Sequence, residues 1–140
     1  MNTELKCILL IDDDKNDNFF HERAIKKSNL ATIVLAKNSG MKALEYLKSM
    51  KDDKEPQPDL IFLDINMPGM NSWDFLKEYN LLDKELLSRI KVIMLTTSDN
   101  PDDKARAKTW NTVSDYIIKP LTKEKMDDIS SRYFIKSLVL

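Results

Sequence analysis

Polar side chains follow short apolar runs at four places in the 140-residue chain. They are Asp12, Asp13 and Asp14 after the first run, then Asp64, Thr96 and Lys119 after three later ones. If these runs are parallel strands of one sheet, their carboxyl ends lie along one edge and the polar residues share a cleft. The spacing therefore predicts a cleft with several carboxylates, one hydroxyl and one ammonium group.

Carboxylates gathered in one cleft repel each other unless a cation lies between them. Oxygen ligands with room for water suit Mg²⁺, which prefers octahedral coordination. A lysine and a hydroxyl at the same place can hold a phosphoryl group. An EF-hand calcium loop starting at Asp12 is excluded, because the sixth position is Asp17 rather than glycine and the twelfth is Arg23 rather than glutamate.

Five apolar runs are the candidate strands of this sheet. They are Cys7–Ile11, Thr32–Ala36, Leu60–Leu63, Val92–Leu95 and Tyr116–Ile118. Each is short and rich in β-branched or large apolar residues, which is typical of strands buried on both faces. Because helical patterns lie between them, we expect right-handed βαβ crossovers and a parallel sheet covered on both sides.

Helical spacing and capping residues mark the segments between the strands. The expected helices lie near Lys15–Ser28, at Met41–Met50 and Trp73–Asn80, from Pro101 onward and from Thr122 onward. Ser39, Ser72, Asn100 and Thr122 are the expected caps of the last four. The polar stretch Lys51–Pro58 is expected to be a surface loop.

Composition excludes several classes of protein. The chain has 22 basic and 23 acidic residues, and this balance argues against a dedicated nucleic-acid binder. No apolar run approaches the roughly 20 residues of a membrane span, and the first residues lack a signal core, so we expect a cytoplasmic protein. The single cysteine, Cys7, excludes an internal disulfide, and two glycines are too few for a glycine-rich phosphate loop.

Four motifs in this order, each at the end of an expected strand, resemble the receiver domain of two-component response regulators. They are Ile8–Asp13, Leu63–Met70, Met94–Thr97 and Asp115–Pro120. The resemblance covers about residues 6 to 130. In its loop lengths the chain is similar to stand-alone receivers of the phytochrome-associated kind. It implies an α/β, flavodoxin-like, doubly wound sheet of five parallel strands in the order 2-1-3-4-5, with five helices.

The resemblance also implies a role for each motif residue. Asp64 would accept a phosphoryl group from a histidine kinase. Asp12, Asp13 and Asp64 would hold Mg²⁺, with the backbone carbonyl of Asn66 as a further ligand. Such a protein catalyses only its own phosphorylation and dephosphorylation and is not otherwise an enzyme.

Four further positions acquire roles in the same way. Thr96 and Lys119 would contact the phosphoryl group, and Thr96 with Tyr116 would form the conformational switch. The bond before Pro120 would be cis. Outside these motifs, we expect Asp14 to lie next to the metal ligands without binding the metal directly. We expect His21 to be a surface or half-buried helix residue rather than a phosphotransfer histidine.

Three other functions remain open at this point. A haloacid-dehalogenase-like phosphatase would use Asp12 and Asp14 as its D-x-D pair, although Lys15 is unusual for that class. A flavodoxin-like electron carrier would have to bind a phosphate beside three aspartates. A degenerate receiver would bind partners without phosphorylation, but Asp64, Thr96 and Lys119 are all present.

We expect one receiver domain over residues 1–140, with its core at about 6–130 and a C-terminal helix and tail to 140. The expected partners are a sensor histidine kinase or phosphotransfer protein and an unidentified downstream protein. A second copy of the chain is another candidate partner, through the face built from Pro101–Trp110, the last strand and Thr122–Ser137. Neither nucleic acid nor a membrane is expected as a partner.

Overall fold

The computed structural model describes residues 4–28, 33–49, 56–67 and 69–134. Its strands are β1 (Cys7–Ile11), β2 (Ile33–Lys37), β3 (Leu60–Leu63), β4 (Lys91–Thr96) and β5 (Val113–Ile118). All neighbouring strands pair in parallel, in the order β2-β1-β3-β4-β5. This arrangement confirms the predicted fold class and strand order.

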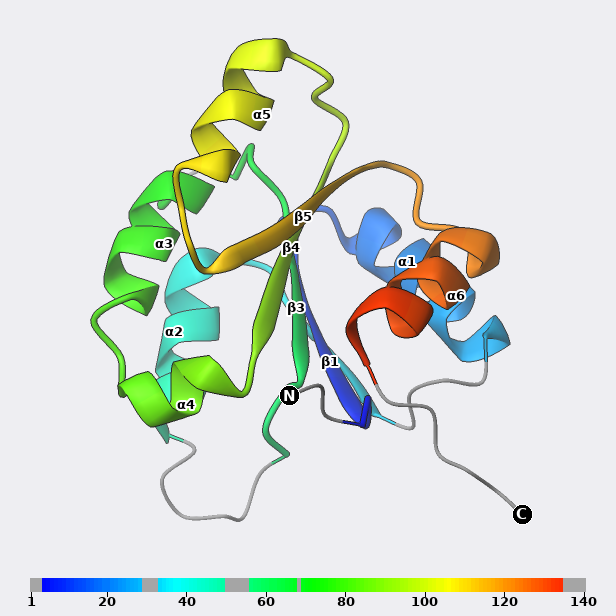
Figure 1. The fold of residues 1–140 in the computed structure, drawn as a ribbon, viewed down its shortest axis with the longest axis horizontal. Coiled ribbons are helices and arrows are strands. Elements are labelled where there is room, and N and C mark those ends of the chain that lie inside the picture. The colour runs from blue at the N-terminus through cyan, green and yellow to red at the C-terminus, as the bar shows by residue number, and fades with distance from the viewer. Residues whose placement is uncertain (1–3, 29–32, 50–55, 68, 135–140) are drawn as a thin grey trace.

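Helices cover the sheet on both sides (Figure 1). They are α1 (Lys15–Lys27), α2 (Gly40–Ser49), α3 (Ser72–Tyr79), α4 (Lys84–Ser88), α5 (Pro101–Lys108) and α6 (Lys123–Tyr133). Helices α1 and α6 lie together on one side, and α2 and α3 lie on the other. The short helix α4 is an addition to the five expected helices, and the side chain of Asp83 caps it by accepting from the N–H of Glu85 over 2.8 Å.

The central strands are buried on both faces because successive side chains point to opposite sides of the sheet. In β1, Leu9 and Ile11 pack into the core beneath α2 and α3, whereas Ile8 and Leu10 pack into the core that contains Ile25 of α1. The strand therefore has no polar face, and the first polar side chain can only follow its end. This is why the acidic run begins at Asp12.

Backbone hydrogen bonds align the strand ends. The N–H of Asp64 donates to the carbonyl of Ile11 over 3.1 Å, and the N–H of Lys119 donates to the carbonyl of Thr96 over 2.8 Å. These bonds continue the ladders beyond the strands, so that the residues following β1, β3, β4 and β5 lie along one edge of the sheet. The polar residues singled out from the sequence are thus positioned by the rigid part of the fold.

Several expected boundaries move. The last strand begins at Val113 rather than Tyr116. Asn71, not Ser72, caps α3, because its side chain accepts from the N–H of Asp74 over 3.0 Å, whereas the hydroxyl of Ser72 is buried. The side chains of Asn100 and Thr122 cap α5 and α6 as predicted.

Some expectations concern residues outside the described part of the chain. They are Thr32, Met50, Pro68, part of the Lys51–Pro58 loop, and the apolar tail from residue 135 onward. In the residues that are described, none of the helices combines the length and the apolar character that crossing a membrane would need.

The two candidate caps of α3 can be separated by mutation. Asn71→Ala removes a side chain that satisfies a helix N–H, so we expect the free energy of unfolding to fall by about 1 kcal/mol. Ser72→Ala removes a hydroxyl for which no partner is found among the described residues, so we expect little loss or a small gain. Urea unfolding of both variants is the measurement, and a larger loss for Ser72→Ala would contradict the assigned cap.

Candidate functional site

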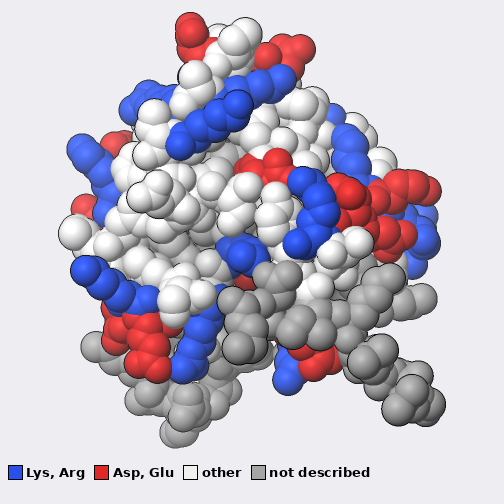
Figure 2. Space-filling model, in the orientation of Figure 1, with Lys and Arg blue, Asp and Glu red and all other residues white. Residues whose placement is uncertain are grey.

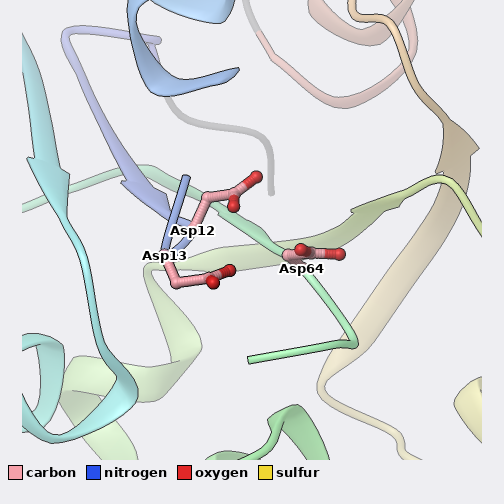
Figure 3. Close-up of side chains that lie close together, drawn as sticks. All are labelled: Asp12, Asp13 and Asp64. Atoms are coloured by element: carbon pink, nitrogen blue, oxygen red, sulfur yellow. The ribbon is translucent and has the colours of Figure 1, made fainter. Parts of the chain in front are cut away.

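Three carboxylates meet at the carboxyl edge of the sheet. One oxygen each of Asp12, Asp13 and Asp64 lies within 4.8 Å of the other two. Figure 3 shows Asp12 and Asp13 entering from the end of β1 and Asp64 from the end of β3. Asp12 and Asp64 are 4% and 8% exposed, whereas Asp13 is exposed. The arrangement offers three hard oxygen ligands on the solvent side of two buried strand ends.

The side chain of Lys119 reaches across from the end of β5 to the same place. Its Nζ lies 2.6 Å from Oδ2 of Asp12, 2.7 Å from Oδ2 of Asp17 and 3.5 Å from Oδ2 of Asp64. The lysine side chain is only 9% exposed. A nearly buried ammonium therefore offsets part of the negative charge of the three carboxylates.

Burial and charge act in opposite directions on the two groups of this pair. Burial raises the pKa of Asp12, and its hydrogen bond from Lys119 counteracts this rise only in part. Burial alone would lower the pKa of Lys119, but its hydrogen bonds to Asp12 and Asp17 and the charge of Asp64 raise it overall. The lysine consequently stays charged throughout the ordinary pH range, whereas the pKa of Asp12 is raised.

The other predicted residues lie at the ends of β4 and β5. Thr96 is fully buried, and its Oγ1 accepts from the N–H of Ser98 over 3.3 Å. The hydroxyl of Tyr116 donates to the carbonyl of Ser98 over 2.7 Å. One loop thus connects Thr96 with Tyr116. Pro120 follows Lys119 through a cis peptide bond, and Asn66 is an exposed residue two positions after Asp64.

His21 differs from expectation, whereas the backbone N–H of Asp14 donates to Oδ1 of Asp12 over 3.0 Å, so that Asp14 lies next to that carboxylate as expected. Asp14 faces α1 and caps it, accepting from the N–H groups of Asn16 and Asp17 over 2.8 and 3.3 Å. His21 is buried, with 3% of it exposed, and it packs near Asp12 and Asp64 around a gap that has no room for a water molecule. The expectation of a surface or half-buried histidine was wrong, because α1 packs that face directly onto the strand ends.

Sequence reasoning missed Asp17. It lies in the first turn of α1, and its carboxylate contacts Lys119 at 2.7 Å. The available signal was its spacing: a helix that begins at Lys15, directly after the acidic run, places its first turn beside the cleft.

A comparison with known families assigns this site. The sequence profile described as the response regulator receiver domain matches residues 8–130, which include β1 from Ile8 onward, the other four strands and all the residues of the acidic site. The chain belongs to this family. It is therefore a two-component receiver domain, its acidic triad is consistent with the phosphoacceptor site, and the family is not one of classical enzymes. A receiver domain also implies a histidine kinase as a partner.

Individual relatives agree with this assignment. The chain is 33% identical to the response regulator Rcp1 of a Synechocystis species over 99 residues, which are 70% of this chain and 66% of that protein. The solved structure of a two-component response regulator from Cytophaga hutchinsonii matches with a TM-score of 0.84 at 28% identity, covering 93% of this chain and 97% of that one. The structure of the phosphorylated cyanobacterial phytochrome response regulator RcpA matches with a TM-score of 0.75 at 30% identity, covering 92% of this chain and 94% of that one.

These results decide between most of the functions left open by the sequence. The receiver prediction is confirmed. The phosphatase alternative also loses its D-x-D pair, because the carboxylate of Asp14 caps a helix.

Repulsion within the triad predicts how Asp13→Asn changes stability. Asp13 is the exposed member, and among the described ion pairs none involves it, so its replacement should relieve repulsion without removing a partner of Lys119. Without divalent cations we expect the free energy of unfolding to rise by about 1 kcal/mol. At saturating Mg²⁺ the parent chain should be the more stable of the two.

The measurement is urea unfolding in EDTA and in Mg²⁺. Asp74→Asn, on the first turn of α3, is the control and should show no such reversal. A gain from Asp13→Asn that is equal in both solutions would contradict the assigned triad.

Burial of His21 predicts acid sensitivity. Burial lowers the pKa of His21 from 6.5 to about 4, and the charge of Lys119 acts in the same direction. As pH falls from about 6.5 to 4, the unfolded chain takes up a proton that the folded chain refuses, so stability is lost over this window. Relative to His21→Leu, the parent should lose about 3 kcal/mol by pH 4. Parallel stability-versus-pH curves for the two chains would contradict this.

Proposed function

We propose that Asp64 is the phosphorylated residue of this receiver domain and that the reaction requires Mg²⁺. The observation that supports this most directly is the position of Asp64: its carboxylate is in the triad with Asp12 and Asp13, and Lys119 Nζ lies 3.5 Å away. A carboxylate at this position meets both requirements of an acceptor, which are ligands for a cation and an ammonium close to the incoming anion.

The residues present fit Mg²⁺. Asp12, Asp13 and Asp64 would hold it, with the backbone carbonyl of Asn66 as the fourth ligand, and the exposure of Asp13 and Asn66 leaves room for water. When bound, the ion neutralises charge between the acceptor carboxylate and the phosphoryl oxygens. The orientation and the remaining charge compensation come from side chains of the protein.

In the proposed step, an Oδ atom of Asp64 attacks the phosphorus of the phosphodonor. The bond from phosphorus to the donor's leaving group breaks, and the leaving group departs with the electron pair, as imidazole from a phosphohistidine or as acetate from acetyl phosphate. Lys119 and the hydroxyl of Thr96 then donate to the phosphoryl oxygens. The product is a mixed anhydride on Asp64.

The contacts around Ser98 connect this step to the surface. If the Thr96 hydroxyl turns to a phosphoryl oxygen, its bond with the N–H of Ser98 changes, and the carbonyl of the same residue holds Tyr116. Tyr116 borders a surface cavity of about 350 Å³ between α5 and β5, together with Lys104, Ala107 and Ile118. We propose the face built from α5, β5 and α6 as the output surface.

This face has the exposure that a partner would need. Five of the six residues of β5 are intermediate in burial and one, Ser114, is exposed. In contrast, β1 and β3 are fully buried. Figure 2 shows basic side chains over α5 and, below them around β5, uncharged side chains with an acidic patch beside them. A downstream protein or a second copy of the chain would dock here in a phosphorylation-dependent manner.

Labelling with acetyl phosphate and Mg²⁺ tests the acceptor. We expect one phosphoryl group per chain, which disappears in Asp64→Asn and in EDTA, while Asp74→Asn serves as the control on α3 and keeps full labelling. Intact-mass spectrometry is the measurement. Full labelling of Asp64→Asn would overturn the proposal, and a folded parent chain that takes no label would favour the degenerate receiver.

Amide hydrogen exchange with Mg²⁺ and beryllofluoride, a phosphoryl mimic, tests the output surface. We expect protection to change in α5, β5 and the Ser98 loop, and Tyr116→Ala should uncouple β5 from the mimic. Light scattering under the same conditions shows whether a second copy binds. Changes confined to α1 would contradict the proposed route.

A further inference from the structure

The ammonium of Lys119 is shared with a carboxylate outside the phosphoacceptor triad. Asp17 on α1 lies 2.7 Å from Nζ, which is 0.8 Å closer than the 3.5 Å to Asp64. The Asp17 side chain is 36% exposed, so it forms the solvent side of the lysine's surroundings. Without a phosphoryl group, Lys119 is thus held at the α1 side of the cleft.

The number of donors makes this sharing consequential. An ammonium group has three donors. Asp12 and Asp17 take two short bonds at 2.6 and 2.7 Å, and the remaining contact, to Asp64, is long. A phosphoryl group on Asp64 would present several anionic oxygens to the same donors. Asp17 therefore competes with that group for Lys119, and it also adds a negative charge beside an incoming anion.

The position of Asp17 is fixed by the start of α1. Asp14 caps the helix through the N–H groups of Asn16 and Asp17, which sets the backbone at this residue. Because α1 also buries Ile25 completely in the core, the helix cannot move away cheaply. The carboxylate can leave Lys119 by turning its own side chain into solvent.

We propose that Asp17 is a positioning residue that holds Lys119 in the unphosphorylated state and opposes capture of the phosphoryl group. This inference rests on the proposed function of Asp64. Occupancy of the site by a phosphoryl group would transfer the ammonium from Asp17 to the phosphoryl oxygens. The affinity of the site for such an anion is thereby set in part from α1.

Beryllofluoride titration at saturating Mg²⁺, followed by fluorine NMR, tests the proposal. Asp17→Asn keeps the shape of the side chain and Asp17→Ala removes it, and we expect both to lower the half-saturating concentration on the order of fivefold, as for loss of a charge-assisted bond. Asp74→Asn is the matched control, because Asp74 is the third residue of α3 as Asp17 is of α1, and its value should stay that of the parent.

A double-mutant cycle separates the effect of the Asp17–Lys119 contact from the effect of removing one negative charge near the site. In a Lys119→Met background, which binds more weakly, we expect the Asp17 substitutions to have no effect. Unchanged or weaker binding of both Asp17 variants in the parent background would overturn the proposal, and so would a gain that persists fully with Lys119→Met. If the parent chain binds no beryllofluoride although it is folded, the proposed function fails as well.

Discussion

One buried positive charge makes the site of this protein possible. The parallel sheet brings the residues after β1, β3 and β5 to one edge, and it therefore gathers Asp12, Asp13 and Asp64. The ammonium of Lys119 lies beside Asp12 and Asp64, the lysine side chain is 9% exposed, and its two bonds shorter than 2.8 Å are to Asp12 and Asp17. Without it, and without a bound cation, the sheet edge would carry only like charges close together, which the low dielectric of a half-buried cleft makes costly.

The same constraint explains why two nearby carboxylates at the start of α1 make different contacts. Asp14 and Asp17 lie three residues apart, yet one caps the helix and the other contacts Lys119. A helix that begins directly after a strand end needs an acceptor for its first N–H groups, and Asp14 supplies it. The first turn then brings the next carboxylate beside the cleft. The short acidic segment from Asp14 to Asp17 thus both caps α1 and provides a hydrogen-bond partner for Lys119.

Much of this could be predicted from the sequence, since buried parallel strands leave short apolar runs that end at polar residues. The order of the sheet and the convergence of Asp12, Asp64 and Lys119 follow from those run ends combined with the family resemblance. The sequence pattern did not reveal Asn71 as the cap of α3, because two capping residues stand side by side. Nor did it place Asp17 or His21, because periodicity shows which residues share a helix face but not which strand end that face covers.

The most direct test of the central claim locates the acyl phosphate by its chemistry. Reduction of the phosphorylated chain with borohydride converts an aspartyl phosphate to homoserine, which peptide mass spectrometry can locate. The account predicts homoserine at position 64 alone, and only after incubation with both Mg²⁺ and a phosphodonor. Homoserine at position 12, 13 or 17 in a chain whose Asp64 stays intact would contradict it.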